Sequence, residues 1–192
     1  MTHIETPLAA ARAAREYVLV TAFLWEAVLR GSVSIEQLAE SFPLDEHNVA
    51  VWPTRTQEYL RTWVWNIFLS SFAISAQGVD HALDDAFGPK PKGAPAKMCD
   101  LDATRTVVYM IRCAFAHNPF NPQWKVKAAY RGLFRIREIG LELDTTRLHG
   151  IDLDVAQLGG PIAYVKLLNL CVKFLKQSPD QAHDVGDRTE QE

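Results

Sequence analysis

Cysteine is scarce in this sequence. Three occur among 192 residues, and no two of them have the spacing of a metal-ligand pair. An odd number of widely separated cysteines implies no disulfide framework, and the six histidines are too scattered to predict a zinc site. No glycine-rich phosphate loop follows a predicted strand, and Gly-x-Ser-x-Gly is absent. We therefore expect neither a metal nor a cofactor.

The chain also lacks the segments that mark exported or membrane proteins. Its first residues have neither the basic start nor the apolar run of a signal peptide. Residues 62–79 carry no charge, but they include three serines, Asn66 and Gln77, whereas a membrane span needs about 20 mostly apolar residues. We interpret this stretch as a buried central helix, with a membrane-associated helical protein as the less favoured alternative. Without a disulfide framework or export signal, a cytoplasmic location is the simplest expectation.

The apolar residues, 48% of the chain, recur mostly at three- and four-residue spacing. Gly31 and Gly88 are expected to end the two long helices. Thr54 and Gln57 form a capping-box pattern at the start of the second one. We predict one mainly helical domain over residues 1–177, a bundle of four to five helices. The predicted helices span residues 7–30, 34–40, 54–87, 100–118 and 161–177.

The remaining segments are predicted as a hairpin, two loops and a tail. Apolar and polar residues alternate at 139–143 and 151–155, which predicts a small β-hairpin near residues 139–155. A loop is expected over 43–53. Three prolines and two glycines in residues 88–97 predict a mobile loop inside the domain. Residues 178–192 are polar and are expected to form a disordered tail.

Arg112 and His117 are the strongest candidates for a functional site. Four residues separate them, so on a helix they lie about 7.5 Å apart along the axis and flank a groove. His117 is expected in the last helical turn, where the carbonyl end favours a cation and makes it a usable proton donor. The alternative is a helix-end pair bound to backbone carbonyls and a neighbouring acid. Asp80, Asp84 and Asp85 are candidates for that acid, although a solvated face is the favoured interpretation of these three aspartates.

The surroundings of this pair favour a polyanion. The chain has a net charge of −3, yet residues 103–137 contain no aspartate or glutamate and seven arginines and lysines. Aromatic residues lie among these cations and could stack on bases. A solvated basic face is the alternative interpretation. The residues predicted to bind RNA are Arg105, Lys125, Lys127, Arg131, Trp124 and Tyr130.

Residues 111–119 read Ile-Arg-Cys-Ala-Phe-Ala-His-Asn-Pro. This stretch resembles the signature of the HEPN superfamily, an arginine followed after four to six residues by a histidine near a helix end. The resemblance implies a metal-independent endoribonuclease that acts as a homodimer, often in toxin–antitoxin or antiviral systems with an antitoxin or regulatory partner. Arg112 would clamp the phosphate and His117 would transfer protons. The apolar faces of the 54–87 helix and the last helix are candidates for the dimer interface.

The residue after the arginine departs from the pattern of active members, which usually carry Asn, Asp or His there. This chain has Cys113. The departure favours an alternative function, a non-catalytic HEPN-like interaction or regulatory domain. Whether the two side chains face a cleft or are bound within the protein distinguishes the two functions.

Overall fold

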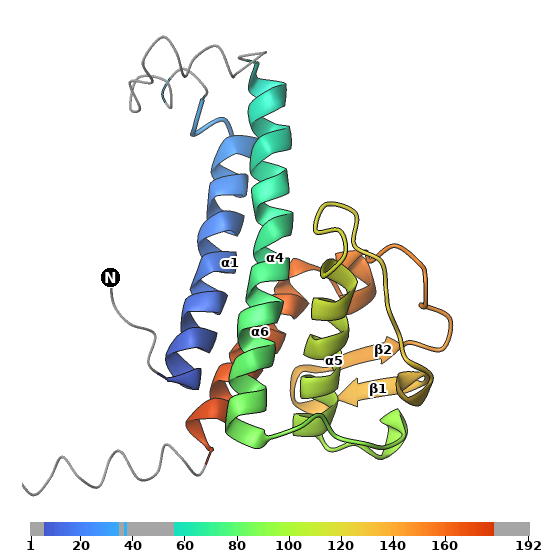
Figure 1. Ribbon diagram of the computed structural model, residues 1–192. Coiled ribbons are helices and arrows are strands. Elements are labelled where there is room, and N and C mark those ends of the chain that lie inside the picture. Colours follow the sequence, from blue (N-terminus) through green and yellow to red (C-terminus); the bar gives the residue numbers. More distant parts are fainter. Residues whose placement is uncertain (1–5, 35–36, 38–55, 179–192) are drawn as a thin grey trace, which may run out of the picture.

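The computed structural model describes residues 6–34, 37 and 56–178, and these form four α-helices, four 3-10 helices and a two-stranded sheet. The elements are α1 (Pro7–Leu29), α4 (Gln57–Phe87), η1 (Pro95–Lys97), α5 (Asp100–Phe115), η2 (Ala128–Tyr130), β1 (Leu133–Ile136), η3 (Arg137–Ile139), β2 (Leu141–Asp144), η4 (Val155–Leu158) and α6 (Pro161–Lys176). Figure 1 shows α1 and α4 as a pair of long antiparallel helices, with α6 crossing behind them and α5 and the sheet to one side. The predicted class, a helical bundle with a small hairpin, is confirmed.

The long helices begin at threonine caps. Thr6 Oγ1 accepts a hydrogen bond from Ala9 N (3.2 Å) at the start of α1. At α4 the cap is Thr56, whose Oγ1 accepts from Tyr59 N (3.2 Å), so the prediction that Gln57 lies three residues inside the helix was wrong. Gln57 is instead the first helical residue, because the threonine directly before it satisfies the free backbone amide. Gly88, at φ 73°, ends the helix as predicted.

Several predictions fall outside the described residues. These are the loop over 43–53, the cap at Thr54 and nearly all of the polar tail. The short helix over 34–40 is described only at its start, where Gln37 N donates to Ser34 Oγ (3.3 Å).

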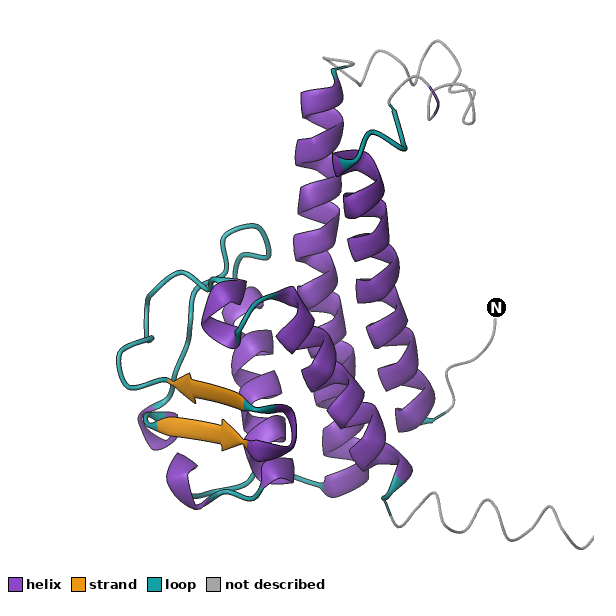
Figure 2. Ribbon diagram, turned by 180° about the vertical axis from the view of Figure 1, so that it is seen from behind, coloured by secondary structure: helices purple, strands orange, loops and turns teal. Residues whose placement is uncertain are grey.

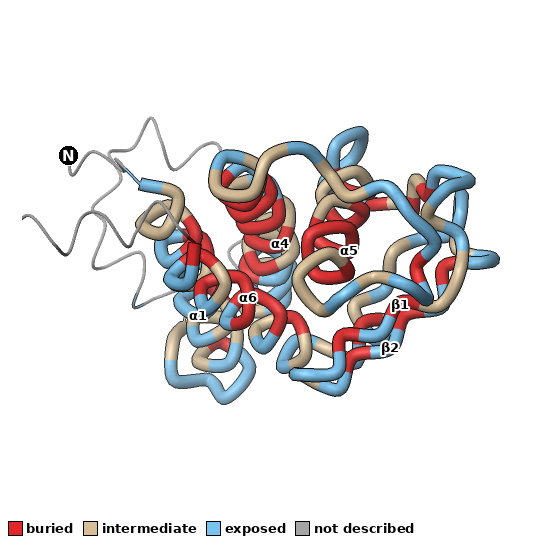
Figure 3. The backbone as a smooth tube through the Cα atoms, turned by 90° about the horizontal axis from the view of Figure 1, so that it is seen from below, coloured by how far each residue is buried: buried red, intermediate tan, exposed pale blue. Residues whose placement is uncertain are grey.

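The core lies where α6 crosses α4. Figure 3 shows buried residues concentrated on the sides of α4, α5 and α6 that face one another. Tyr164 of α6 is fully buried, and its hydroxyl lies 2.8 Å from Ser75 Oγ and donates to the Phe72 carbonyl (3.2 Å). Ser71 also donates, to the Phe68 carbonyl (2.6 Å). Ser71 and Ser75 of the uncharged stretch are thus paired inside the protein. No described helix meets the length and apolarity of a membrane span.

One of the two predicted strands is found, since β2 overlaps the run at 139–143, but it pairs with β1 and not with the run at 151–155. Leu133 pairs with Asp144 and Ile136 with Leu141, in antiparallel register. The run at 151–155 forms no strand; Asp152 makes only an isolated bridge to Gln123. The first strand escaped prediction because its buried Phe134 and Ile136 lie among basic residues that were assigned to a binding surface.

The loop over 88–97, which was predicted to be mobile, is held by contacts at both of its ends. Lys90 forms ion pairs with two aspartates of α4, and the carbonyls of Gly88 and Pro89 accept hydrogen bonds from Arg105. Pro95 is buried and packs against Gly132. A Cβ atom added at Gly132 would lie 3.2 Å from Cγ of the Pro95 ring. These contacts tie the two ends of the loop to the rest of the protein, while residues 92–94 between them are exposed.

Tyr164→Phe should lower the free energy of unfolding by about 1–2 kcal/mol, since a buried hydroxyl with two partners is lost. Urea denaturation followed by circular dichroism measures the change. Tyr17→Phe is the matched control, because Tyr17 lies on the surface, and it should shift stability by less than about 0.5 kcal/mol. Equal effects of the two substitutions would show that the buried hydroxyl contributes nothing.

Candidate functional site

A buried carboxylate on α4 organises the candidate site. Asp80 is fully buried, and its Oδ2 accepts a hydrogen bond from Arg112 NH1 (3.1 Å). Its other oxygen, Oδ1, lies 2.8 Å from Lys90 Nζ. A charge inside a protein is tolerated only when it is paired. Asp80 therefore ties together α4, the loop that follows it and α5.

One turn further along α4, Asp84 extends this network. It pairs with Lys90 and, at 3.4 Å, with the NH2 of Arg105. The Arg105 guanidinium lies 5.8 Å from the centre of the Phe87 ring and is almost entirely buried. Arg105 was predicted to bind RNA, but in this conformation it cannot reach a phosphate because the protein covers it. It holds the connection between α4 and α5 instead.

Arg112 is both positioned and accessible. One nitrogen of its guanidinium binds Asp80, while 37% of the side chain stays exposed. Asp80 is thus the orienting acid among the three aspartates proposed from the sequence. Cys113, the next residue, is half-buried.

His117 lies beyond the helix rather than in its last turn. α5 ends at Phe115, and His117 is exposed in the turn that follows. The helix stops early because Asn118 Oδ1 accepts hydrogen bonds from the backbone amides of Phe120 and Asn121, both at 3.1 Å. Such side-chain bonds offer the backbone an alternative to the helix. The prediction that His117 lies in the last turn of the helix was therefore wrong.

Tyr109 lies between two lysines and was missed by the sequence analysis. The Nζ atoms of Lys90 and Lys127 lie 5.5 Å and 5.2 Å from the centre of its ring. A hydrogen bond to the Tyr109 hydroxyl raises the pKa of Lys127 above its ordinary value. Tyr109 precedes Arg112 by three residues, so the two side chains are neighbours on the helix surface. The three-residue spacing between Tyr109 and Arg112 was the feature of the sequence that could have identified Tyr109 as part of the site.

The predicted basic surface is smaller in the structure. Lys127 and Arg131 are exposed, and Lys125 and Tyr130 are half-buried. Trp124, predicted to stack on bases, is fully buried, and its Nε1 donates to Gln157 Oε1 (2.7 Å). It is therefore a core residue and offers no face to a base.

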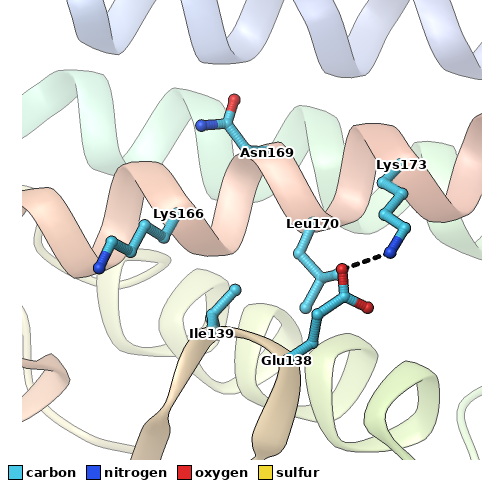
Figure 4. A pocket seen from close by; sticks show the side chains of 6 residues that line it. All are labelled: Glu138, Ile139, Lys166, Asn169, Leu170 and Lys173. Carbon is cyan, nitrogen blue, oxygen red and sulfur yellow. Dashed lines mark hydrogen bonds and ion pairs between the residues drawn. The ribbon is translucent and has the colours of Figure 1, made fainter.

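A separate hollow of the structure contains none of the candidate residues. It measures about 210 Å³ and lies between α6 and η3 (Figure 4). Across it, Lys173 Nζ pairs with Glu138 Oε1 at 2.5 Å. The lining residues are Glu138, Ile139, Lys166, Asn169, Leu170 and Lys173.

Comparisons of the chain with protein-family models, with curated proteins and with solved structures found no match. Among residues 6–34, 37 and 56–178, no three His, Cys, Asp or Glu side chains are grouped as metal ligands.

Asp80→Ala should lower the free energy of unfolding by about 2–4 kcal/mol, because two cations lose a buried partner. Asp80→Asn should lie between this variant and the natural chain, since it keeps the shape and removes the charge. The matched control is Asp85→Ala, an exposed aspartate of the same helix, with an expected change below about 0.5 kcal/mol. Urea denaturation of all three variants is the measurement, and equal losses for Asp80→Ala and Asp85→Ala would contradict the proposed role of Asp80.

Proposed function

We propose that this protein is an RNA-binding, metal-independent endoribonuclease whose working residues are Arg112 and His117. One observation supports this most. Arg112 is fixed by a buried carboxylate and still exposes 37% of its side chain, while His117 is exposed just beyond the end of the same helix. The HEPN superfamily signature, to which residues 111–119 are similar, implies the same roles.

The chemistry needs no metal because RNA carries its own nucleophile, the 2′-hydroxyl. Attack of this oxygen on the adjacent phosphorus forms a charged phosphorane, and loss of the 5′-oxygen leaves a cyclic phosphate. Arg112 stabilises the phosphorane charge without reorganising, because Asp80 already holds it in place. His117 transfers a proton, as a base from the 2′-hydroxyl or as an acid to the leaving oxygen.

A single histidine cannot serve as base and acid in the same step. In a homodimer, a second copy would supply the other histidine, as the resemblance implies. The face of α6 offered as an interface is not available, because Leu167, Leu168 and Leu175 lie in the protein's own core. The partner surface must then lie on other helices.

RNA affinity in this proposal comes from cations beside the Arg112–His117 pair. Lys127 and Arg131 are exposed, and Lys125 is half-buried. Phosphate contacts supply most of the affinity of such surfaces, and they weaken steeply with salt. The half-buried rings of Tyr109 and Tyr130, whose centroids lie 6.1 Å apart, provide an aromatic surface beside Lys127, whose Nζ lies 5.2 Å from the centre of the Tyr109 ring.

The second candidate is a non-catalytic interaction or regulatory domain. Two observations favour it. Cys113 stands where active members carry a polar residue, and the charge of Arg112 is already balanced by Asp80. In a toxin–antitoxin or antiviral system, such a domain would bind a regulatory protein through the same surface.

Cleavage is tested with labelled single-stranded RNA in the presence of chelator. The natural chain should cut and leave a cyclic phosphate, whereas DNA of the same sequence stays intact because it lacks the 2′-hydroxyl. His117→Ala and Arg112→Ala should each lose about 10²–10³ in rate. His149→Ala, an exposed histidine elsewhere, is the matched control and should cut normally. If the natural chain and His117→Ala are equally inert on varied RNAs, the interaction domain replaces the nuclease.

Binding is tested separately from cutting. The double substitution of Lys125 and Lys127 by alanine should weaken RNA affinity and flatten its logarithmic salt dependence by roughly 1.4, about 0.7 for each lost phosphate contact. Fluorescence anisotropy at several salt concentrations measures both. The double alanine substitution of Lys166 and Lys176, exposed on α6, is the control. Equal salt slopes for the two double variants would place the RNA elsewhere.

A further inference from the structure

The turn that follows α5 carries an exposed aromatic side chain. Phe120 is 64% exposed, and residues 116–121 around it are all exposed. In the part of the chain that the structure describes, the other exposed aromatic side chains all belong to α1 or α4. Phe120 is thus the exposed ring that lies on the same segment as the candidate site, three residues after His117.

Hydrogen bonds fix the backbone beneath this ring. Asn118 Oδ1 accepts hydrogen bonds from the amides of Phe120 and Asn121, both at 3.1 Å. Side-chain bonds of this kind stabilise a tight turn, and Pro119 within the turn has a restricted φ. An aromatic ring has only two side-chain torsions to order. Phe120 can therefore bind a flat ligand at a small cost in conformational entropy.

The segment returns to the end of α5 directly after this ring. Gln123 N donates to the Ala114 carbonyl (3.3 Å), and Figure 1 and Figure 2 show the loop projecting beyond the end of the helix. Phe120 lies three residues from Gln123 and three from His117, and three residues span at most about 11 Å. The ring is therefore close enough to His117 for neighbouring nucleotides of one strand to contact both.

The charges around the ring favour a nucleic acid as its ligand. Residues 103–137 contain no acid, and Lys125 and Lys127 follow the turn. Proteins bind single strands in this way, with cations along the phosphates and aromatic rings against the bases. Base pairs of a duplex stack on one another, so an aromatic side chain takes its base from an unpaired strand. Single exposed rings are common on proteins, but this one stands on a fixed turn beside Arg112 and His117.

We propose that Phe120 stacks on an unpaired base next to the phosphate that Arg112 binds, so that the site selects single-stranded RNA. Every base has an aromatic face, so stacking discriminates little between bases. A phenyl ring also has no donor or acceptor with which to read a base edge. The expected substrate is unpaired RNA with no required base beside the cut. This inference rests on the proposed function, because it assigns a substrate-binding residue to the same site.

Binding to RNA that cannot be cut tests the stacking apart from cleavage. A labelled oligonucleotide with methylated 2′-hydroxyls lacks the nucleophile, and its fluorescence anisotropy reports binding by the full chain. Phe120→Ala should weaken the affinity for the unpaired strand by about 5- to 150-fold, the range for one lost base stack. Phe120→Leu, which keeps an apolar side chain without a ring, should lose as much, and Phe120→Trp should bind like the natural chain.

Two controls separate stacking from other effects. Phe23→Ala removes an equally exposed phenylalanine, 78% exposed on α1, and should bind like the natural chain. An abasic strand of the same length should bind the natural chain and Phe120→Ala equally, because it offers phosphates without bases. The slope of affinity against salt should not change in Phe120→Ala, since no phosphate contact is lost.

The role of Phe120 is refuted if Phe120→Ala binds the unpaired strand as tightly as Phe23→Ala does. It is also refuted if Phe120→Trp binds as weakly as Phe120→Ala, or if Phe120→Ala loses the same affinity for the abasic strand. A natural chain that binds no unpaired RNA would refute the proposed function together with this inference. Binding that depends on Phe120, in a chain that cuts no RNA, would support the stacking and refute the cleavage.

Discussion

The ion pairs of Asp80 are the constraint on which the rest of this structure depends. A carboxylate without solvent access needs cations, and Asp80 receives them from two different segments, Lys90 and Arg112. The ion pair with Lys90 fixes the loop that follows α4. The ion pair with Arg112 fixes the rotation of α5 about its axis. Leaving either partner out would strand a buried charge, which is far more costly than losing a surface ion pair. The cluster thus locks α4, the connecting loop and α5 in one arrangement.

The same constraint separates the basic residues into two groups. Lys90 and Arg105 are already paired with an aspartate of α4, and Arg105 also donates to a backbone carbonyl of the α4–α5 connection. Lys127 and Arg131 stay exposed. Arg112 belongs to both groups, because its guanidinium is paired with Asp80 while part of its side chain remains exposed. A positioned but accessible guanidinium is suited to binding a phosphate, since the entropy of ordering it has been paid during folding.

The long helices show a second separation, between apolar residues that build the fold and apolar residues that do not. Folding of the single chain uses the sides of α1 and α4 that face each other and α6. Other apolar side chains of the same helices, among them Val20, Phe23 and Ile74, are exposed and lie outside that core. The uncharged stretch of α4 is divided in the same way, with Ser71 and Ser75 buried and Ile74 exposed.

The sequence by itself determined the helices, because their apolar periods, threonine caps and terminating glycines are local signals. It also singled out Arg112 and His117, whose types and spacing are local as well. Only the tertiary structure decided which residues near them are available. Trp124 and Arg105 looked like binding residues in the chain, yet packing against α5, η4 and the α4–α5 loop buries them. One strand, β1, was missed for the same reason, since Phe134 and Ile136 become recognisable as strand residues only when α5 covers them. Burial and charge pairing depend on contacts between distant segments, and no local pattern contains them.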